Sequence, residues 1–190
     1  MKLLDRLKEW LGRRALVKEA QPDRKPVAKN LAMSVKVGII YFVADETAHN
    51  QVRNYVKKIK EELGLTKIMA LGYYDEKVMP HYLHAKLNFD VFSVKDLNWY
   101  RIPHGNVVQN FMAEEYDVLI DLTVHDLLPL QYILAKSRAR FKVGRQSETN
   151  AHFLDMMIDT AGADSLSQLI ANVNRYLMMI NAPKEVPSLN

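Results

Sequence analysis

Five polar residues, placed at or just after apolar, strand-forming segments, are the residues of this chain that most readily suggest chemistry: Asp45, Tyr73, Asp121, Thr123 and Arg145. In a parallel sheet the carboxyl ends of the strands meet at one edge, where ligands usually bind. Asp121 can accept hydrogen bonds from a ligand or, together with Asp45, hold a divalent cation. Alternatively, the two aspartates only cap the helix or turn that follows each strand. We predict that these five residues form a ligand pocket.

The spacing of the glycines restricts the ligand that such a pocket can take. The seven glycines never cluster, so the chain contains neither the dinucleotide-binding fingerprint nor a P-loop. It has no cysteine and no GxSxG motif, which gives covalent acyl chemistry little support. His81 and His84 have the spacing of two helical metal ligands, but no third ligand stands at a fixed distance, and surface histidines are the preferred interpretation. We predict no metal site, and the sequence does not indicate a cofactor.

Basic residues gather in two segments. The first 30 residues contain nine Lys or Arg and four Asp or Glu, a net charge of +5, whereas the other 160 residues sum to −1. In the second segment, residues 136–145, alternation places Arg138, Arg140 and Lys142 on one side of a strand, where they either meet phosphates or protect a solvated edge against aggregation. The predicted contacts to an anionic partner are Arg6, Arg13, Arg14, Lys18, Arg24, Lys25, Arg138, Arg140 and Lys142.

Two large aromatic residues, Trp99 and Tyr100, lie in the loop-like segment KDLNWYRIP. If they are exposed, they form a stacking surface for a base, a sugar or a protein partner. The alternative is that they close the core beneath a long loop, with their polar groups hydrogen-bonded.

The hydrophobic pattern defines the elements that must position these residues. Near the start, Leu3, Leu7 and Leu11 belong to an apolar stripe at helical spacing with basic residues around it, which predicts an amphipathic basic helix. Residues 17–34 lose this period and carry Pro22 and Pro26, so they are interpreted as a tether. We call residues 1–34 the arm, and we predict a single α/β domain over residues 35–182 and a tail over 183–190.

Strands and helices are expected to alternate along the domain. Strands are predicted over residues 35–43, 67–72, 90–93, 116–122, 138–143 and 153–158, and helices over 48–63, 106–115, 126–137 and 165–180. Asp126 is the expected N-cap of the third helix, and Asn106 with Gln109 suggests a capping box for the second. Together these elements predict a three-layer, Rossmann-like α/β fold with a mostly parallel sheet of about five or six strands, preceded by the amphipathic helix.

Length and composition agree with one globular domain. The chain has 190 residues, of which 48% are hydrophobic, enough for one substantial core. No apolar run reaches the length of a signal-peptide core or a transmembrane helix, and the absence of cysteine is compatible with a reducing compartment. These observations favour a cytoplasmic protein without a transmembrane segment.

Several segments also carry a family resemblance. KLLDRLKEWLGRR, VGIIYFVADE, LGYYDEK, KDLNWY, YDVLIDL and LPLQYILAKSRARFKVGR together resemble an uncharacterised domain-of-unknown-function family of small Rossmann-like proteins from Bacteroidota. The resemblance covers nearly the whole chain and implies no activity. The shorter stretch from YDVLIDL to FKVG is also similar to the N-terminal half of heptosyltransferase-like glycosyltransferases.

Three functional hypotheses follow. The first is a non-enzymatic binding module that docks onto an anionic partner, RNA or a ribonucleoprotein, through its basic arm and residues 136–145. The alternative is a nucleotide or sugar-phosphate binding protein, or a small enzyme, that uses the strand-end pocket. In the third, the arm is an oligomerisation helix or another protein-binding element.

Overall fold

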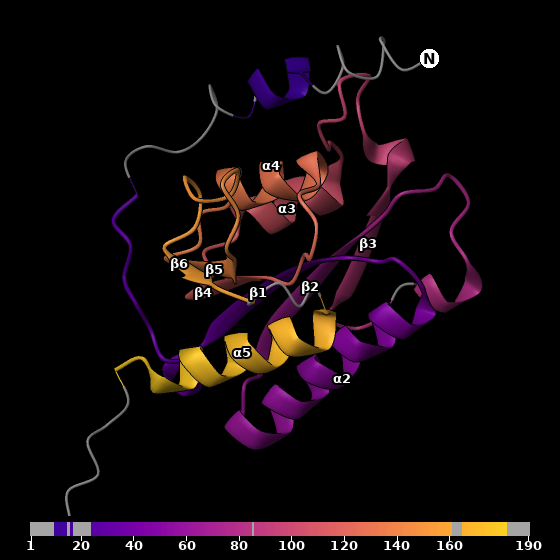
Figure 1. Ribbon diagram of the computed structural model, residues 1–190. Helices are drawn as coiled ribbons and strands as arrows, with labels where there is room; N and C mark the ends of the chain where they lie inside the picture. The colour runs from indigo at the N-terminus through magenta and orange to yellow at the C-terminus, as the bar shows by residue number, and fades with distance from the viewer. Residues whose placement is uncertain (1–9, 15, 17–23, 85, 161–164, 182–190) are drawn as a thin grey trace, which may run out of the picture.

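The structure is a computed structural model that describes residues 10–14, 16, 24–84, 86–160 and 165–181 (Figure 1). Strands and α-helices follow one another as the hydrophobic period predicts. The strands are β1 (Lys36–Phe42), β2 (Lys67–Tyr74), β3 (Phe89–Ser93), β4 (Val118–Asp121), β5 (Phe141–Arg145) and β6 (Met156–Ile158). The helices are α2 (Glu46–Leu63), α3 (Asn106–Ala113), α4 (Leu128–Lys136) and α5 (Leu166–Met179), with 3-10 turns η1 (Leu31–Met33), η2 (His81–Leu83) and η3 (Val94–Asp96).

The six strands form one sheet in the order β3-β2-β1-β4-β5-β6, and every neighbouring pair is parallel. The predicted Rossmann-like α/β class is therefore confirmed. In β1 the apolar residues Val37, Ile39 and Ile40, which point to both faces, are fully buried, as expected for a parallel strand covered on both faces. Chain order reverses between β1 and β4, which lie side by side at the centre of the sheet.

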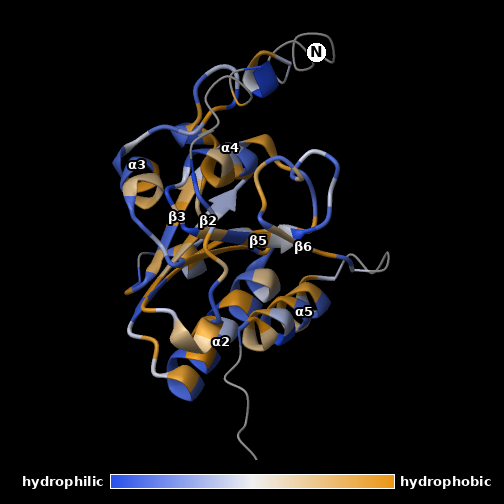
Figure 2. Cartoon of the chain, turned by 90° about the vertical axis from the view of Figure 1, so that its left-hand side faces the viewer, coloured by the Kyte–Doolittle hydropathy of each residue, from blue (hydrophilic) through white to orange (hydrophobic). Residues whose placement is uncertain are grey.

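Two helical layers cover the sheet, and they are unequal. Helices α2 and α5, of 18 and 14 residues, pack on one face and share its core (Figures 1 and 2). Helices α3 and α4, of only 8 and 9 residues, pack on the other face. At 1.5 Å per residue, α3 is about 12 Å long, less than half the length of an eight-residue strand such as β2.

The helix ends agree only in part with the sequence. Asp45 is the N-cap of α2, and its Oδ1 accepts a hydrogen bond from the Ala48 backbone at 2.7 Å. Two expected caps are wrong. Helix α4 begins after Leu127, because the Asp126 carboxylate is held instead by side chains at the end of β5 and just after it. Helix α3 has Gly105 as its N-cap and no side-chain cap.

The arm contacts the thinner helical layer. Residues 10–14 are helical, and Leu16 is buried in the core beneath α3 and α4. Gly12 makes the closest approach, since an added Cβ would lie 2.5 Å from both Leu128 Cδ2 and the Tyr100 carbonyl oxygen. A side chain at this position would therefore separate the helix from the domain.

Residues 24–34, which we call the strap, pass along one side of the molecule from the α4 layer to the α5 layer (Figure 1). At one end, Arg24 donates to the Ala139 and Arg140 carbonyls and to Asp155. At the other, the buried amide of Asn30 donates to the Met178 and Ile180 carbonyls, which terminate α5. The strap thus ties the two helical layers together.

Strand β5 corrects the expectation of a half-exposed basic strand. It lies inside the sheet between β4 and β6, and Lys142 is only 2% exposed. The Lys142 ammonium donates to the carbonyls of Leu134 and Ala135 in the last turn of α4, at 2.6 and 3.3 Å. Burial, and secondarily the positive charge of Arg24, lowers the pKa of Lys142 to about 7. Lys142 therefore satisfies two backbone carbonyls at the C-terminal end of α4 and does not face solvent.

We expect Lys142 to make stability depend on pH. The folded protein releases the Lys142 proton near pH 7, whereas the unfolded chain retains it to about pH 10.4, so the free energy of unfolding rises with pH between these values. In Lys142→Met this rise should disappear, as measured by urea denaturation from about pH 7 to about pH 9.5, below tyrosine ionisation. Lys58→Met, on the exposed side of α2, is the matched control and should keep it. An equal slope in Lys142→Met and the wild type would contradict this assignment.

Candidate functional site

The predicted pocket residues lie in or just after strands near the carboxyl edge of the sheet, where all six parallel strands end. At the point where chain order reverses, a hollow of about 340 Å³ lies between the ends of β1 and β4 and the first turns of α2. Asp45, Thr47, Gln51 and His125 are among the residues that line it. Ligands of open α/β sheets bind at such a reversal.

Asp45 gives this hollow an acidic character. Its Oδ1 accepts a hydrogen bond from the Ala48 N–H in the first turn of α2, and Glu46 adds a second acid in the same turn. Free N–H groups at a helix N-terminus attract anions, but here one of them is taken and two carboxylates lie in the same turn. The negative charge at the α2 N-terminus therefore disfavours a phosphate there.

Asp121 and Thr123 are in contact with each other and not with the hollow. Asp121 Oδ1 accepts hydrogen bonds from the Thr123 backbone at 3.0 Å and from its hydroxyl at 2.6 Å. Asp121 is 1% exposed, and this burial raises its pKa to about 6 against the opposing effects of Thr123 and Arg145. Asp121 and Thr123 thus satisfy each other by hydrogen bonds at the end of β4.

Arg145 belongs to a polar cluster beside the start of α4. Its Nη2 donates to Asp126 at 2.7 Å, and the same carboxylate accepts hydrogen bonds from Ser147 and Thr149 at 2.8 and 2.5 Å. Buried Gln131 donates to Thr149, which joins α4 to the cluster. Two buried atoms, Arg145 Nε and Gln131 Oε1, have no hydrogen-bond partner within the described ranges.

Tyr73, the last predicted pocket residue, lies on the other side of the sheet. It is buried in the core beneath α3 and α4, and its hydroxyl donates to Asp75 at the end of β2. Burial and the Asp75 carboxylate raise the Tyr73 pKa far above its ordinary value, so its hydroxyl stays protonated. The structure thus brings Asp121 to Thr123 and near Arg145, but Asp45 and Tyr73 do not join them.

The predicted basic contacts also separate. Arg6 and Lys18 lie outside the described residues, and Lys142 and Arg24 are engaged within the domain. Arg138 and Arg140 are exposed where α4 ends, whereas Gly12 of the arm lies where α4 begins. A nine-residue helix separates these places by about 13 Å. Exposed basic side chains of the described arm and strap include Arg14 and Lys25.

Two exposed tryptophans lie on segments that touch each other. Trp10 on the arm helix is 53% exposed, and the Arg14 guanidinium lies 5.2 Å from the centre of its ring. Trp99 is 57% exposed on the loop whose Tyr100 carbonyl meets Gly12. Tyr100 itself packs against the core and supports Trp99 edge to face at 6.0 Å. The expected core lid is thus Tyr100, and Trp99 is a surface residue.

The loop that carries Trp99 has a defined conformation. Asn98 Oδ1 accepts hydrogen bonds from the backbones of Tyr100 and Ile102, and Arg101 adopts a left-handed φ of 68°. Leu97 and Pro103 form an isolated bridge at its base. Arg101 pairs with Asp75 at 3.4 Å, an exposed contact of little strength. We call Trp10, Arg14, Trp99 and Arg101 the indole surface.

The sequence indicated only part of the indole surface. Trp10 shares the helical period of the apolar stripe in the arm, and periodicity alone predicts that it is buried. The signal that could have revealed it is Arg14 four residues later, since this spacing brings a cation over an indole on a helix. His81 and His84 are both exposed, and no group of three or more His, Cys, Asp or Glu in the described part of the chain is arranged to hold a metal ion.

Comparison with known proteins gives a family and no activity. Residues 8–180 match the model of a family described as a family of unknown function, DUF6913. No curated protein and no solved structure matches the chain. Within the described ranges no helix is both long and apolar enough to cross a membrane.

Asp121→Asn tests whether burial at the carboxyl edge raises the pKa of the Asp121 carboxyl group. The folded protein holds the Asp121 proton up to about pH 6, while the unfolded chain loses it near pH 3.8. The free energy of unfolding should therefore fall as pH rises through this window, and the fall should be absent in Asp121→Asn. We expect the variant to be more stable than the wild type at neutral pH, by about 1–3 kcal/mol in urea denaturation. A variant that is less stable there would show that Asp121 is stabilised as a carboxylate.

Proposed function

We propose that this chain, which belongs to the DUF6913 family of unknown function, is a non-enzymatic α/β module that docks onto RNA or a ribonucleoprotein through its basic arm. The observation that carries the proposal is the indole surface. Two tryptophans, each more than half exposed, lie on the arm helix and on the loop that touches it. Burying an indole is among the largest gains available to a fold, and these two remain largely in solvent.

Exposed indoles next to arginines suit unpaired nucleotides. Every base has a π-face, so a base can stack on an indole whatever its sequence, and such contacts are worth about 1–3 kcal/mol per base. Arg14 lies over the Trp10 ring, and Arg101 is in the Trp99 loop, where each can also meet a phosphate. The arrangement favours a single-stranded segment over a duplex.

The charge distribution supports the same partner. The first 30 residues carry a net charge of +5, while the rest of the chain is nearly neutral. Arg138 and Arg140 extend the basic character to the far end of α4, at a distance that a few nucleotides can span. Phosphate contacts of this kind release counterions, so affinity should fall steeply with salt.

The carboxyl edge gives less support to the alternative ligand, a nucleotide or sugar phosphate. Asp45 and Glu46 stand at the helix N-terminus where a phosphate would bind, and Asp121 and Thr123 are buried against each other. Arg145 is already paired with Asp126. We also infer that the protein is cytoplasmic, a location that is compatible with an RNA partner. We further infer that it comes from Bacteroidota.

The test is fluorescence anisotropy with the full chain and a labelled, unstructured RNA of about 20 nucleotides. We expect the affinity to drop by at least about tenfold between about 50 mM and about 200 mM salt. Trp10→Ala and Trp99→Ala should each weaken binding about tenfold, because each removes one stacking platform. Arg14→Glu should weaken binding and flatten the salt dependence.

Matched controls lie on the opposite helical layer. Met179→Ala removes a side chain as exposed as Trp99, and Lys57→Glu reverses a charge on α2. Both should bind as the wild type does. The proposal fails if the RNA does not bind at low salt, or if the three indole-surface variants and the two controls bind equally well.

A further inference from the structure

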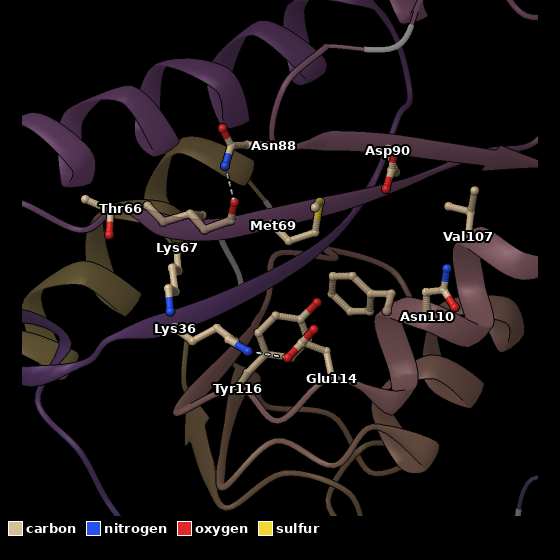
Figure 3. A pocket seen from close by; sticks show the side chains of 12 residues that line it. Lys36, Thr66, Lys67, Met69, Asn88, Asp90, Val107, Asn110, Glu114 and Tyr116 are labelled. Atoms are coloured by element: carbon tan, nitrogen blue, oxygen red, sulfur yellow. Dashed lines mark hydrogen bonds and ion pairs between the residues drawn. The ribbon is translucent and has the colours of Figure 1, made fainter.

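A second hollow, of about 410 Å³, opens at the amino edge of the sheet, on the face covered by α3 (Figure 3). It is bounded by the first residues of β1 and β2, by β3 and by α3. This is the opposite end of the strands from the predicted pocket, and no sequence motif pointed to it. It is also independent of the indole surface and of the proposed RNA partner.

The hollow exists because α3 is short and because Tyr116 lies flat on the sheet. Helix α3 covers less than half of the length of β2, and Met69 is left only partly buried. The Tyr116 ring lies directly over Gly38 of β1, where an added Cβ would be 2.9 Å from the ring. Glycine at this position makes room for the ring, which forms one side of the hollow.

The Tyr116 hydroxyl is a free hydrogen-bonding group in this hollow. Tyr116 is 2% exposed and lines the hollow, and its hydroxyl, which is not among the fully buried atoms without a partner, makes no hydrogen bond within the residues that the structure describes. Burial, followed by the nearby Glu114 and Asp90 carboxylates, raises its pKa well above the ordinary value. It therefore stays protonated and can donate to a ligand as well as accept from one.

The charges around the hollow are unequally satisfied. Lys36 and Glu114 form an ion pair at one side and neutralise each other (Figure 3). Asp90 is half-buried and has no ion pair or side-chain hydrogen bond within the described ranges. The backbone of Lys67 lies about 13 Å away along the strands, because Asp90 is in register with Leu71, four residues further along β2. The charge available at the β3 side is therefore negative.

The walls between these polar groups are apolar and polarisable. Met69 lines the hollow from β2, and Phe111 and Val107 line it from α3. A thioether and an aromatic ring in one hollow are suited to a planar aromatic group. A half-buried carboxylate beside them is suited to a protonated amine.

We propose that the amino-edge hollow binds a small aromatic amine, with its ring between Met69 and Phe111, its ammonium group at Asp90 and a hydrogen bond to the Tyr116 hydroxyl. The ligand class follows from three features of the hollow: its apolar walls, the Asp90 carboxylate and the Tyr116 hydroxyl. The ring of the ligand replaces solvent on the apolar walls, and its ammonium group supplies the missing partner of Asp90.

Tryptamine is the probe, titrated into the full chain by ligand-observed NMR at neutral pH. Two comparison probes test the ring and the ammonium group of tryptamine separately. Indole-3-propionate keeps the ring and reverses the charge, and hexylamine keeps the cation without the ring. We expect saturable binding of tryptamine, and binding of each comparison probe that is weaker by at least about tenfold.

Variants assign the site. Asp90→Asn should reduce tryptamine affinity by about tenfold or more, and Tyr116→Phe, which keeps the ring over Gly38, by a few-fold. Asp75→Asn, an exposed acid outside the hollow, is the matched control and should not change it. The proposal is overturned if tryptamine shows no saturable binding, if indole-3-propionate binds equally well, or if Asp90→Asn binds tryptamine as the wild type does.

Discussion

A parallel sheet must be covered on both faces, and in this chain the cover is unequal. Helices α2 and α5 provide 32 residues of helix on one face, whereas α3 and α4 provide 17 on the other. An exposed apolar sheet face is costly, at roughly 25 cal/mol per Å². The thinner layer therefore determines where additional chain must pack and where the surface stays open.

Both candidate binding surfaces are consequences of this inequality. The arm supplements the thin layer, with Leu16 in the core and Gly12 against Leu128, and this contact brings Trp10 to the Trp99 loop. Where neither the arm nor α3 reaches, the amino-edge hollow remains beside Tyr116. At the carboxyl edge, in contrast, polar side chains of the predicted pocket are engaged with one another, as Arg145 is with Asp126.

Much of the fold can be predicted from the sequence, because hydrophobic period and local caps report on contacts between near neighbours. The alternation of strands and helices and the cap at Asp45 are of this kind.

The predictions that were wrong involve partners distant in the sequence. From its local sequence Asp126 is expected to be an N-cap, but its carboxylate binds Arg145, 19 residues later. Lys142 alternates like an edge residue, but β6 pairs beside it and α4 supplies two carbonyls. Exposure of Trp10 depends on the size of the surface beneath the arm helix, which the apolar stripe does not record; only Arg14, four residues later, is a local sign of it.

The strap has a consequence for the order in which the protein can form during synthesis. Asn30 is made early, but the carbonyls that its amide contacts, those of Met178 and Ile180, follow 148 and 150 residues later. At about 5–20 residues per second, the ribosome needs roughly 8–30 s to produce them. During that interval the Asn30 end of the strap lacks its final hydrogen-bond partners. The strap is thus synthesised long before the end of α5, to which its Asn30 side chain is finally bonded.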